Sequence, residues 1–262
     1  MTATKPPPLV LITGASSGLG QALALRYHRA GWRLALVARR EEPMRAWAQA
    51  QGLAADRVTV YAADVCDGAA LAALGVACLA GPGLPEVVIA NAGISVGMDT
   101  ADAADIEVMR QTFETNVIGM AATFQPFVTA MCQRGHGKLV GIASVAGIRG
   151  LPGHGAYCAS KAAVISYCES LRGECRPYGV KVVTITPGYI DTPLTQRNRY
   201  KMPFLLSADA FADRAYRDIE AGVRTRVIPW QMGLVAGLMR LLPDALFDRL
   251  FAGRPRKRRQ HE

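Results

Sequence analysis

The chain has 262 residues, of which 50% are apolar, and its formal net charge is +9. This length allows one large α/β domain or two small ones, and this apolar content excludes wholesale disorder. Five basic residues lie in the last ten, GRPRKRRQHE, and no basic stripe interleaved with aromatic residues occurs elsewhere. We therefore expect no nucleic-acid partner, and a solvated basic tail over 252–262.

The six cysteines form no CxxC pair and have no histidine cluster beside them, so we expect reduced thiols and no metal site. The N-terminal segment lacks the apolar core of a signal peptide, and no run reaches the roughly 18 apolar residues of a membrane span. These features predict a cytoplasmic protein, with residues 1–8 as a flexible leader.

Apolar runs rich in β-branched residues alternate with helical patterns along the chain. The runs are almost continuously apolar, as strands covered on both faces must be; they are 9–13, 33–38, 57–62, 86–91, 138–144, 180–186 and a shorter one at 225–229. The helical patterns cover 18–30, 41–51, 67–79, 103–133 and 156–176. This alternation predicts a single α/β domain over 1–262, a Rossmann-type doubly wound parallel sheet of six to seven strands flanked by helices on both faces.

The segment LITGASSGLG joins the first predicted strand to the first predicted helix. Its three glycines have the spacing GxxxGxG, which permits a tight turn and a close approach of the backbone to a pyrophosphate. The N-terminus of the following helix would offer free N–H groups to the phosphates. The residues predicted to bind the phosphates are Gly14, Ser16, Ser17, Gly18, Leu19 and Gly20.

The residues after the second predicted strand indicate which nicotinamide cofactor the chain prefers. An acidic residue there binds the ribose 2′-hydroxyl of NAD(H), whereas an Arg receives the 2′-phosphate of NADP(H). Arg39 and Arg40 are the first residues past this strand, and Glu41 and Glu42 begin the next helix, where acids suit the helix dipole. NADP(H) is therefore favoured over NAD(H); the alternative is that both arginines are solvated surface residues.

Two roles are open for Asp64, which follows the third predicted strand. Its carboxylate could hold the adenine amino group, with Val65 beside it in the same site, or it could cap the helix that starts near Asp67. The sequence does not decide between the two.

Six motifs come in the order and spacing of the short-chain dehydrogenases/reductases, and the chain resembles this family from about residue 9 to 192. They are TGASSGLG (13–20), NAG (91–93), TNVIG (115–119), Ser144, YCASK (157–161) and PGYIDT (187–192). Ala90 departs from the family, which commonly has Asn there. The resemblance implies a catalytic tetrad of Asn116, Ser144, Tyr157 and Lys161. It also implies cofactor contacts from Asn91, Ala92, Gly93, Tyr157, Lys161, Pro187, Gly188, Ile190 and Thr192.

The chemistry of such a site can be reasoned from the side chains. Hydride transfer to a carbonyl carbon requires a proton for the oxygen and a group that polarises it. Tyr157, with a free pKa of about 10, needs a stabilised phenolate, and Lys161 lies four residues on, on the same helical face. We expect its ammonium to lower the Tyr157 pKa, Ser144 to hydrogen-bond the substrate oxygen, and Asn116, by resemblance, to hold a water that links Lys161 to solvent.

Cys158, the next residue after Tyr157, points about 100° around the helix from Tyr157, and no base is assigned to it. We therefore exclude it as a nucleophile, and we expect Ser160 to pack the helix or touch the cleft. His154, in the loop before, is interpreted as a bystander.

The last third is expected to determine the substrate. Residues 189–227 are predicted to form a lid and a helix over the site. Apolar residues around it predict a hydrophobic carbonyl compound or secondary alcohol as substrate; the candidates are Ile94, Val96, Met98, Ile148, Leu151, His154, Tyr189, Leu194 and Phe204. The alternative to an NADP(H)-dependent oxidoreductase is a catalytically silent nucleotide-binding regulator, or a membrane-surface scaffold, on the same fold.

Two expectations concern partners. The segment 228–251 is predicted to form two amphipathic helices, and it is too interrupted to span a bilayer. Together with the basic tail, through 228–259, these helices could rest on an anionic membrane surface. Alternatively, they could pack on the lid or on a second subunit. By resemblance, the helices 103–133 and 156–176 pair across a two-fold axis, which predicts a homodimer or homotetramer.

Overall fold

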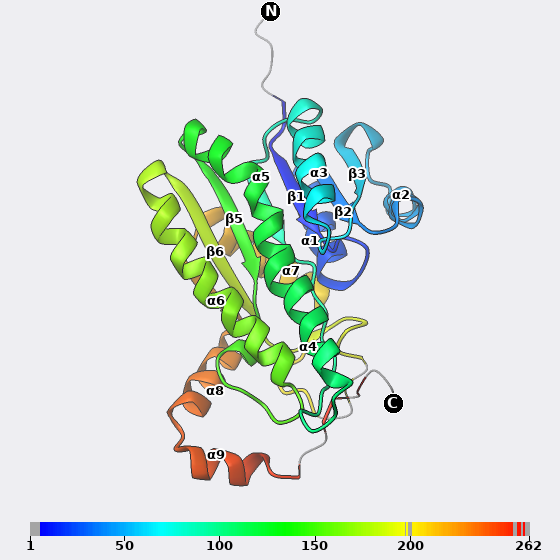
Figure 1. The fold of residues 1–262 in the computed structure, drawn as a ribbon. Coiled ribbons are helices and arrows are strands. Elements are labelled where there is room, and N and C mark those ends of the chain that lie inside the picture. Colours follow the sequence, from blue (N-terminus) through cyan, green and yellow to red (C-terminus); the bar gives the residue numbers. More distant parts are fainter. Residues whose placement is uncertain (1–5, 197, 199–200, 254–255, 258, 260–262) are drawn as a thin grey trace, which may run out of the picture.

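The computed structural model describes residues 6–196, 198, 201–253, 256–257 and 259. In this part of the chain, seven parallel strands form one sheet in the order β3-β2-β1-β4-β5-β6-β9 (Figure 1). The strands are β1 (Leu9–Thr13), β2 (Arg33–Ala38), β3 (Val58–Ala62), β4 (Val87–Ala90), β5 (Gly137–Ile142), β6 (Val180–Pro187) and β9 (Thr225–Ile228). The predicted Rossmann-type parallel sheet is confirmed, and the shorter run near 225–229 is its edge strand.

Helices cover both faces of this sheet (Figure 1). On one face lie α1 (Gly18–Arg29), α2 (Glu41–Ala50) and α7 (Ala208–Ala221), which bury Tyr27, Met44 and Phe211 against the strands. On the other face lie α3 (Gly68–Ala80), α5 (Gly119–Arg134) and α6 (Gly155–Cys175), which bury Phe124, Phe127 and other side chains. The two cores explain why the strands are apolar along their whole length: each faces helices on both sides.

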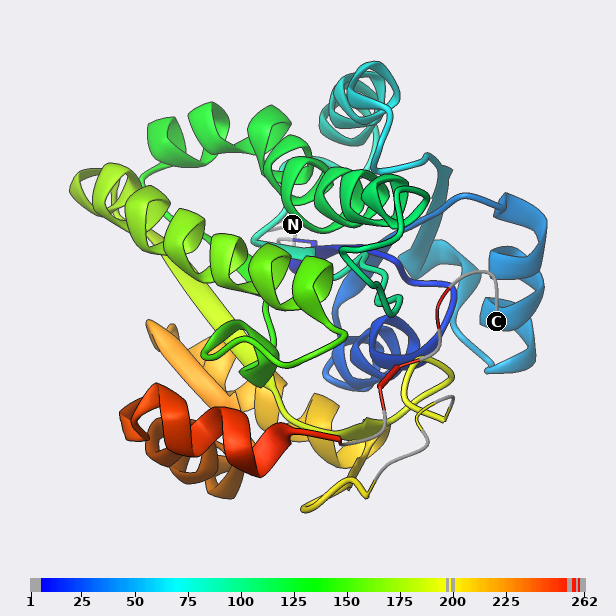
Figure 2. The ribbon, with the colours of Figure 1, turned by 60° about the horizontal axis from the view of Figure 1, so that its bottom comes forward.

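The strand order reverses between β1 and β4, which are neighbours in the sheet although two strands separate them in the chain. In open α/β sheets, ligands bind outside the carboxyl ends of the strands at such a point. Figure 2 turns this edge toward the viewer, with the segment after β6 and the end of the chain lying across it.

The helix predicted over 103–133 is divided in the structure. It consists of α4 (Asp105–Phe113), a π-helical turn at Glu114–Ile118 and α5. A π-turn replaces i+4 by i+5 hydrogen bonds, and such turns are frequent at functional sites. Asn116 lies within this turn, so the irregularity coincides with a predicted catalytic residue.

The predicted lid is smaller than expected. Its first part contains two short paired strands, β7 (Ile190–Asp191) and β8 (Leu206–Ser207). However, α7 packs against α1 with Phe211 and Ile219 fully buried, so this helix belongs to the sheet's cover and does not lie over the site. Arg197, Arg199 and Tyr200 of the predicted lid lie outside the described residues.

The C-terminal region forms α8 (Trp230–Leu241) and α9 (Asp244–Phe251). Arg149 joins them: its guanidinium donates to the Leu242 carbonyl at 2.6 Å, pairs with Asp244 at 2.8 Å and lies 4.0 Å from the centre of the Phe247 ring. These helices therefore pack on the loop after β5, through Arg149. In the described part of the chain, no helix has the length and apolar character needed to cross a membrane.

The described residues near each end of the chain contact the rest of the fold, which the sequence did not predict. Of the leader, Pro7 and Pro8 accept hydrogen bonds from Arg33 at 2.9 and 2.8 Å, which ties them to β2; residues 1–5 lie outside the described residues. In the basic tail, Arg256, Lys257 and Arg259 contact Asp99, Ser95 and Asp105, respectively. These three cations are therefore not a solvated end, and the other tail arginines lie outside the described residues.

Candidate active site

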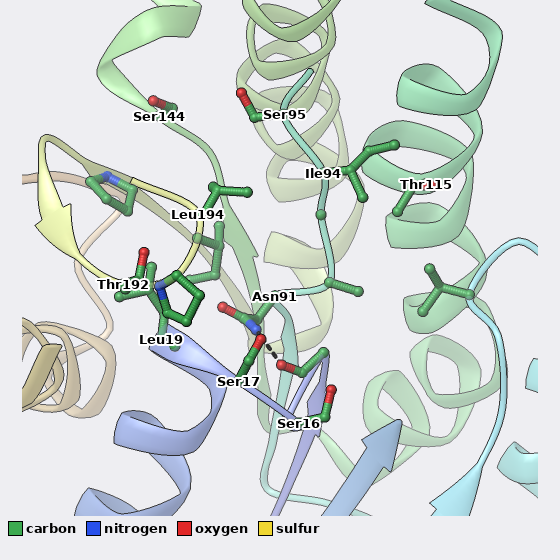
Figure 3. Close-up of a pocket in the computed structure, with 18 of the residues that line it drawn as sticks. Ser16, Ser17, Leu19, Asn91, Ile94, Ser95, Thr115, Ser144, Thr192 and Leu194 are labelled. Atoms are coloured by element: carbon green, nitrogen blue, oxygen red, sulfur yellow. Dashed lines mark hydrogen bonds between the residues drawn. The ribbon is translucent and has the colours of Figure 1, made fainter. Parts of the chain in front are cut away.

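A cavity of about 550 Å³ opens at the carboxyl ends of the strands, at the reversal point between β1 and β4. This volume is within the range of small-molecule sites. In Figure 3 the start of α1, with Ser16, Ser17 and Leu19, forms one side near Asn91, and Thr192 and Leu194 lie opposite Ile94 and Thr115. Of the predicted cofactor residues, all but Gly20 and Arg40 line the cavity; of the predicted tetrad, Ser144, Tyr157 and Lys161 line it and Asn116 lies behind its wall.

The glycine loop owes its glycines to close packing within the protein. Gly14 and Gly18 have left-handed φ angles of +64° and +53°, which disfavour other residues. A Cβ at Gly14 would lie 2.7 Å from the Ala92 backbone, and a Cβ at Gly20 would lie 2.2 Å from the Gly14 carbonyl oxygen. Gly20 therefore shapes the loop from behind and need not touch a ligand.

The start of α1 fits a phosphate group. Its N-cap residue, Ser17, makes no side-chain capping hydrogen bond, and its first turn contains no acidic side chain. By contrast, α3 is capped by Asp67, whose carboxylate accepts from the Ala70 N–H at 2.9 Å. An uncapped helix N-terminus beside a cavity offers N–H groups and a positive dipole end to an anion. The residues present therefore fit the pyrophosphate of a dinucleotide.

The two roles left open for Asp64 can now be separated. The cap of α3 is Asp67, while Asp64 accepts a hydrogen bond from the Cys66 N–H at 3.0 Å and lines the cavity. Asp64 is therefore not the helix cap. Of the two predicted arginines, Arg39 lines the cavity, whereas Arg40 is exposed outside it as the N-cap residue of α2.

The end of the cavity that holds the predicted catalytic residues Ser144, Tyr157 and Lys161, which we call the catalytic end, is enclosed by β5 and the start of α6. Lys161 is buried, and its Nζ donates to the Ile142 carbonyl at 2.8 Å and lies 5.9 Å from the centre of the Tyr157 ring. Ser144 follows β5, and the short helix after it packs tightly on α6, because a Cβ at Gly147 would lie 2.6 Å from the Lys161 carbonyl carbon. This packing sets Ser144 beside Tyr157.

Burial dominates the titration of both groups. It lowers the pKa of Lys161 to about 8. Burial also raises the pKa of Tyr157, while a hydrogen bond with Ser144 acts in the opposite direction. The lowering of the Tyr157 pKa that we predicted from Lys161 is thus not found. The phenol keeps its proton at neutral pH.

Asn116 joins the two walls of the catalytic end. Its side chain is buried; Oδ1 accepts from the Ile94 N–H at 2.8 Å, and Nδ2 donates to the Ile94 carbonyl and to Ser160 Oγ, both at 3.0 Å. Ser160 Oγ in turn donates to the Tyr157 carbonyl at 2.8 Å. Asn116 therefore positions the loop after β4 relative to the turn of α6 that carries Tyr157, a role the sequence did not reveal.

The structure also brings residues into the site that sequence reasoning missed. Cys66, Ser95 and Thr115 line the cavity, and Cys66 Sγ lies 3.4 Å from Thr115 Oγ1. Thr115 is the first residue of the TNVIG motif and Ser95 lies two residues after NAG, which was the available signal. Of the predicted substrate residues, Ile94 and Leu194 line the cavity, whereas Met98 and His154 are buried beside it and Phe204 is exposed. Among the described residues, no group of His, Cys, Asp or Glu side chains could hold a metal ion.

Comparisons with known proteins agree with this geometry. The family model for short chain dehydrogenases matches residues 8–203. An uncharacterized oxidoreductase of Myxococcus xanthus is 39% identical over 241 residues, which cover 91% of this chain and 94% of that protein. A short-chain dehydrogenase from Sphingobium yanoikuyae, solved in complex with NADPH, is 28% identical with a TM-score of 0.74, covering 91% of this chain and 97% of that one. One from Burkholderia phymatum, in complex with NAD, is 25% identical with a TM-score of 0.79, covering 89% and 92%.

The parallel sheet, the uncapped helix at its reversal point and the Tyr–Lys pair beside it define a dinucleotide-binding oxidoreductase fold. Within that class, the chain belongs to the short-chain dehydrogenase/reductase family, whose members use nicotinamide cofactors.

Proposed function

We propose that the protein is an NADP(H)-dependent oxidoreductase that interconverts a hydrophobic carbonyl compound and its secondary alcohol, with Tyr157 as general acid and base. The observation that carries this proposal is the half-buried Tyr157, flanked by Ser144 and Lys161, at one end of a cavity that reaches Arg39 at the other. Ile94 and Leu194, which line the same cavity, support an apolar substrate. One of the similar solved structures contains NADPH and another contains NAD, so the proposed preference for NADP(H) over NAD(H) rests on Arg39.

The residues present fit a nicotinamide dinucleotide, and different residues would bind its different parts. The start of α1 would hold the pyrophosphate, Arg39 the 2′-phosphate and Asp64 with Val65 the adenine. Pro187, Gly188, Ile190 and Thr192 would surround the nicotinamide. When bound, the cofactor supplies or takes up the hydride.

The chain's own residues handle the proton. In reduction, Tyr157 gives its phenolic proton to the carbonyl oxygen, while the Ser144 hydroxyl donates a hydrogen bond to that oxygen. Because burial raises the pKa of Tyr157, the phenol is protonated at neutral pH, which suits the reductive direction. Lys161, whose pKa is lowered to about 8 by burial, can return a proton to the phenolate at low cost.

Replacement of the phenol hydroxyl tests this assignment. We expect Tyr157→Phe to reduce turnover of accepted carbonyl compounds by about 10²- to 10⁴-fold, since a general acid contributes that much, while NADPH still binds. The matched control is Tyr178→Phe, because Tyr178 is exposed after α6. Turnover is read as NADPH oxidation over a carbonyl panel, and binding by titration. Equal turnover in Tyr157→Phe overturns the mechanism; NADPH binding without turnover of any compound by the native protein favours the silent regulator.

We also propose that the protein is a homodimer or homotetramer, paired through α4, α5 and α6. This rests on family resemblance and on Ile106, Met109 and Ile118, which are exposed apolar residues on α4 and the π-turn. Light scattering after size exclusion measures the mass. Ile118→Lys should lower it toward that of a 28.0 kDa monomer; an unchanged mass excludes this face.

For the C-terminal helices we propose contact with an anionic membrane surface. Trp230, Leu234, Leu238 and Leu241 form one stripe of α8, each between 63% and 82% exposed, and Leu246 and Leu250 of α9 are exposed as well. Arg240 and Arg249 are exposed on the same helices and suit anionic headgroups. Because Arg256, Lys257 and Arg259 bind elsewhere in the chain, the proposed contact is narrower than 228–259. Flotation with anionic vesicles tests it. We expect the native protein to float with the vesicles and the double variant Leu234→Lys, Leu238→Lys not to. If the native protein does not float either, the proposal is excluded.

A further inference from the structure

Three C-terminal cations, Arg256, Lys257 and Arg259, lie against the loop between β4 and α4, beside the catalytic end of the cavity. Arg259 Nε pairs with Asp105 Oδ2 at 2.7 Å, and its guanidinium also bonds to Asp102. Arg256 lies 3.7 Å from an Asp99 carboxylate oxygen. Figure 2 shows the end of the chain crossing this edge next to the segment that follows β6. The position of these cations is thus set by ion pairs to one loop.

Arg259 provides the firmest of these contacts. The Asp105 side chain is wholly buried, and its Oδ2 also accepts from the Asp99 N–H at 2.6 Å. The hydrogen bond from Arg259 and then that from Asp99 lower the pKa of Asp105, so the carboxylate is ionised. A buried charge that loses its partner is strongly destabilising. Asp105 therefore holds Arg259 in place, and Lys257 is only two residues away along the chain.

Lys257 lies beside the catalytic end of the cavity. Its Nζ donates to Ser95 Oγ at 2.8 Å, and Ser95 lines the cavity. The same Nζ lies 6.0 Å from the centre of the Tyr157 ring. Next to Lys257 in the chain, Arg256 packs on Gly153, where a Cβ would lie 2.9 Å from the Arg256 Cβ. The lysine at position 257 is therefore brought next to a residue that lines the cavity near Tyr157, although it lies 100 positions after Tyr157 in the sequence.

The other ionisable groups facing this position do not replace Lys257. The Lys161 ammonium donates to the Ile142 carbonyl within the protein. Burial, and to a smaller extent the charge of Lys257, lowers the pKa of His154, while its hydrogen bond with the Pro152 carbonyl acts in the opposite direction, so its ring is neutral. Asp99 and Asp105 pair with Arg256 and Arg259.

We propose that Lys257 is a substrate-contacting residue that selects carbonyl compounds with a carboxylate one to three bonds from the reacting carbon. A carboxylate is the group that forms a charge-assisted hydrogen bond with an ammonium. The 6.0 Å separation from the Tyr157 ring leaves room for a few bonds between that carboxylate and an oxygen held by the Tyr157 hydroxyl. Ile94 and Leu194 would contact the apolar remainder of the same molecule. This inference rests on the proposed function and specifies its substrate class.

The test compares acids with their neutral esters on the NADP⁺-loaded protein, where binding is measured without turnover. The probes are benzoylformate, benzoylacetate and 3-benzoylpropionate, each beside its methyl ester, and binding is followed by calorimetry. We expect the acid of at least one pair to bind about ten- to a hundredfold more tightly than its ester, the strength of a hydrogen bond to a charged group. Lys257→Met should bind acid and ester alike, with unchanged NADP⁺ affinity, and Lys257→Arg should restore part of the preference.

Two further variants complete the design. Arg259→Met should weaken the preference for the acid, because it removes the contact that positions Lys257, whereas Lys181→Met, at an exposed lysine of β6, should leave it intact. The proposal is overturned if the native protein binds no acid better than its ester, or if the preference survives in Lys257→Met. Failure of the proposed function is distinguishable, because it appears as undiminished turnover in Tyr157→Phe whatever the acid preference.

Discussion

The two ends of the cavity differ in how far their polar side chains are exposed to solvent. At one end Lys161, Ser144 and Asn116 are buried and hydrogen-bonded within the protein. At the other end Arg39 and Asp64 are exposed. At the buried end the pKa values of two side chains are shifted: burial raises the pKa of Tyr157 and lowers that of Lys161. At the exposed end, solvent and salt screen the charges. On the proposed function, the chemistry would depend on groups fixed by packing and the choice of cofactor on a screened surface charge. We therefore expect substitutions at the buried end to have the larger effects.

The largest effect is expected at Lys161, where function and stability should change in opposite directions. Burial without a carboxylate partner disfavours the ammonium, and Lys161→Met removes that penalty along with one hydrogen bond. We expect turnover to fall by about 10²-fold or more, while the free energy of unfolding rises by about 1–3 kcal/mol at pH 7. Enzyme assays and urea denaturation measure the two quantities.

The pH dependence gives the sign of this effect independently. Because the folded-state pKa of Lys161 is lowered to about 8 from 10.5, the folded chain releases its proton first as pH rises. The native protein therefore regains stability between about pH 8 and pH 10.5, and the advantage of Lys161→Met fades over that window. A variant less stable than the native protein at pH 7 would contradict the proposed burial penalty.

The next effect is expected at Asn116, whose amide holds the two walls together. Asn116→Ala loses three hydrogen bonds and leaves the Ile94 N–H and carbonyl without this partner. We expect the free energy of unfolding to fall by about 2–4 kcal/mol, together with turnover, because Tyr157 is no longer fixed relative to the loop after β4. The control is Thr112→Ala, one turn earlier, whose buried hydroxyl bonds only within its own helix in the described structure. Equal losses in the two variants would show that Asn116 has no special positioning role.

How far the sequence predicts this molecule differs between local and distant relations. The strands β1 and β2 begin and end at the predicted residues, since their apolar character is local information. The glycine loop and the Tyr157–Lys161 pair are also local patterns. The π-turn at Asn116, by contrast, coincides with contacts of one amide with Ile94 and Ser160, which are distant in the sequence, and no periodicity signals it. Lys257 donates to Ser95 and its neighbour Arg259 pairs with Asp105, so the described residues of a tail whose composition predicts solvation are bound to the fold.

The smallest effect is expected at the exposed end, and a pair of adjacent arginines tests it. Arg39 lines the cavity and Arg40 does not, although both are exposed and each change to Asp alters the net charge equally. Arg39→Asp should weaken NADPH binding by about 10- to 100-fold, the range for a lost bond to a charged group, and should leave NADH binding unchanged or improve it. Arg40→Asp should change either affinity less than about threefold. Because the Arg39 contact is screened, the difference between the cofactors should shrink as salt increases. If Arg39→Asp weakens both cofactors equally, Arg39 does not read the 2′-phosphate and the exposed end has no part in cofactor choice.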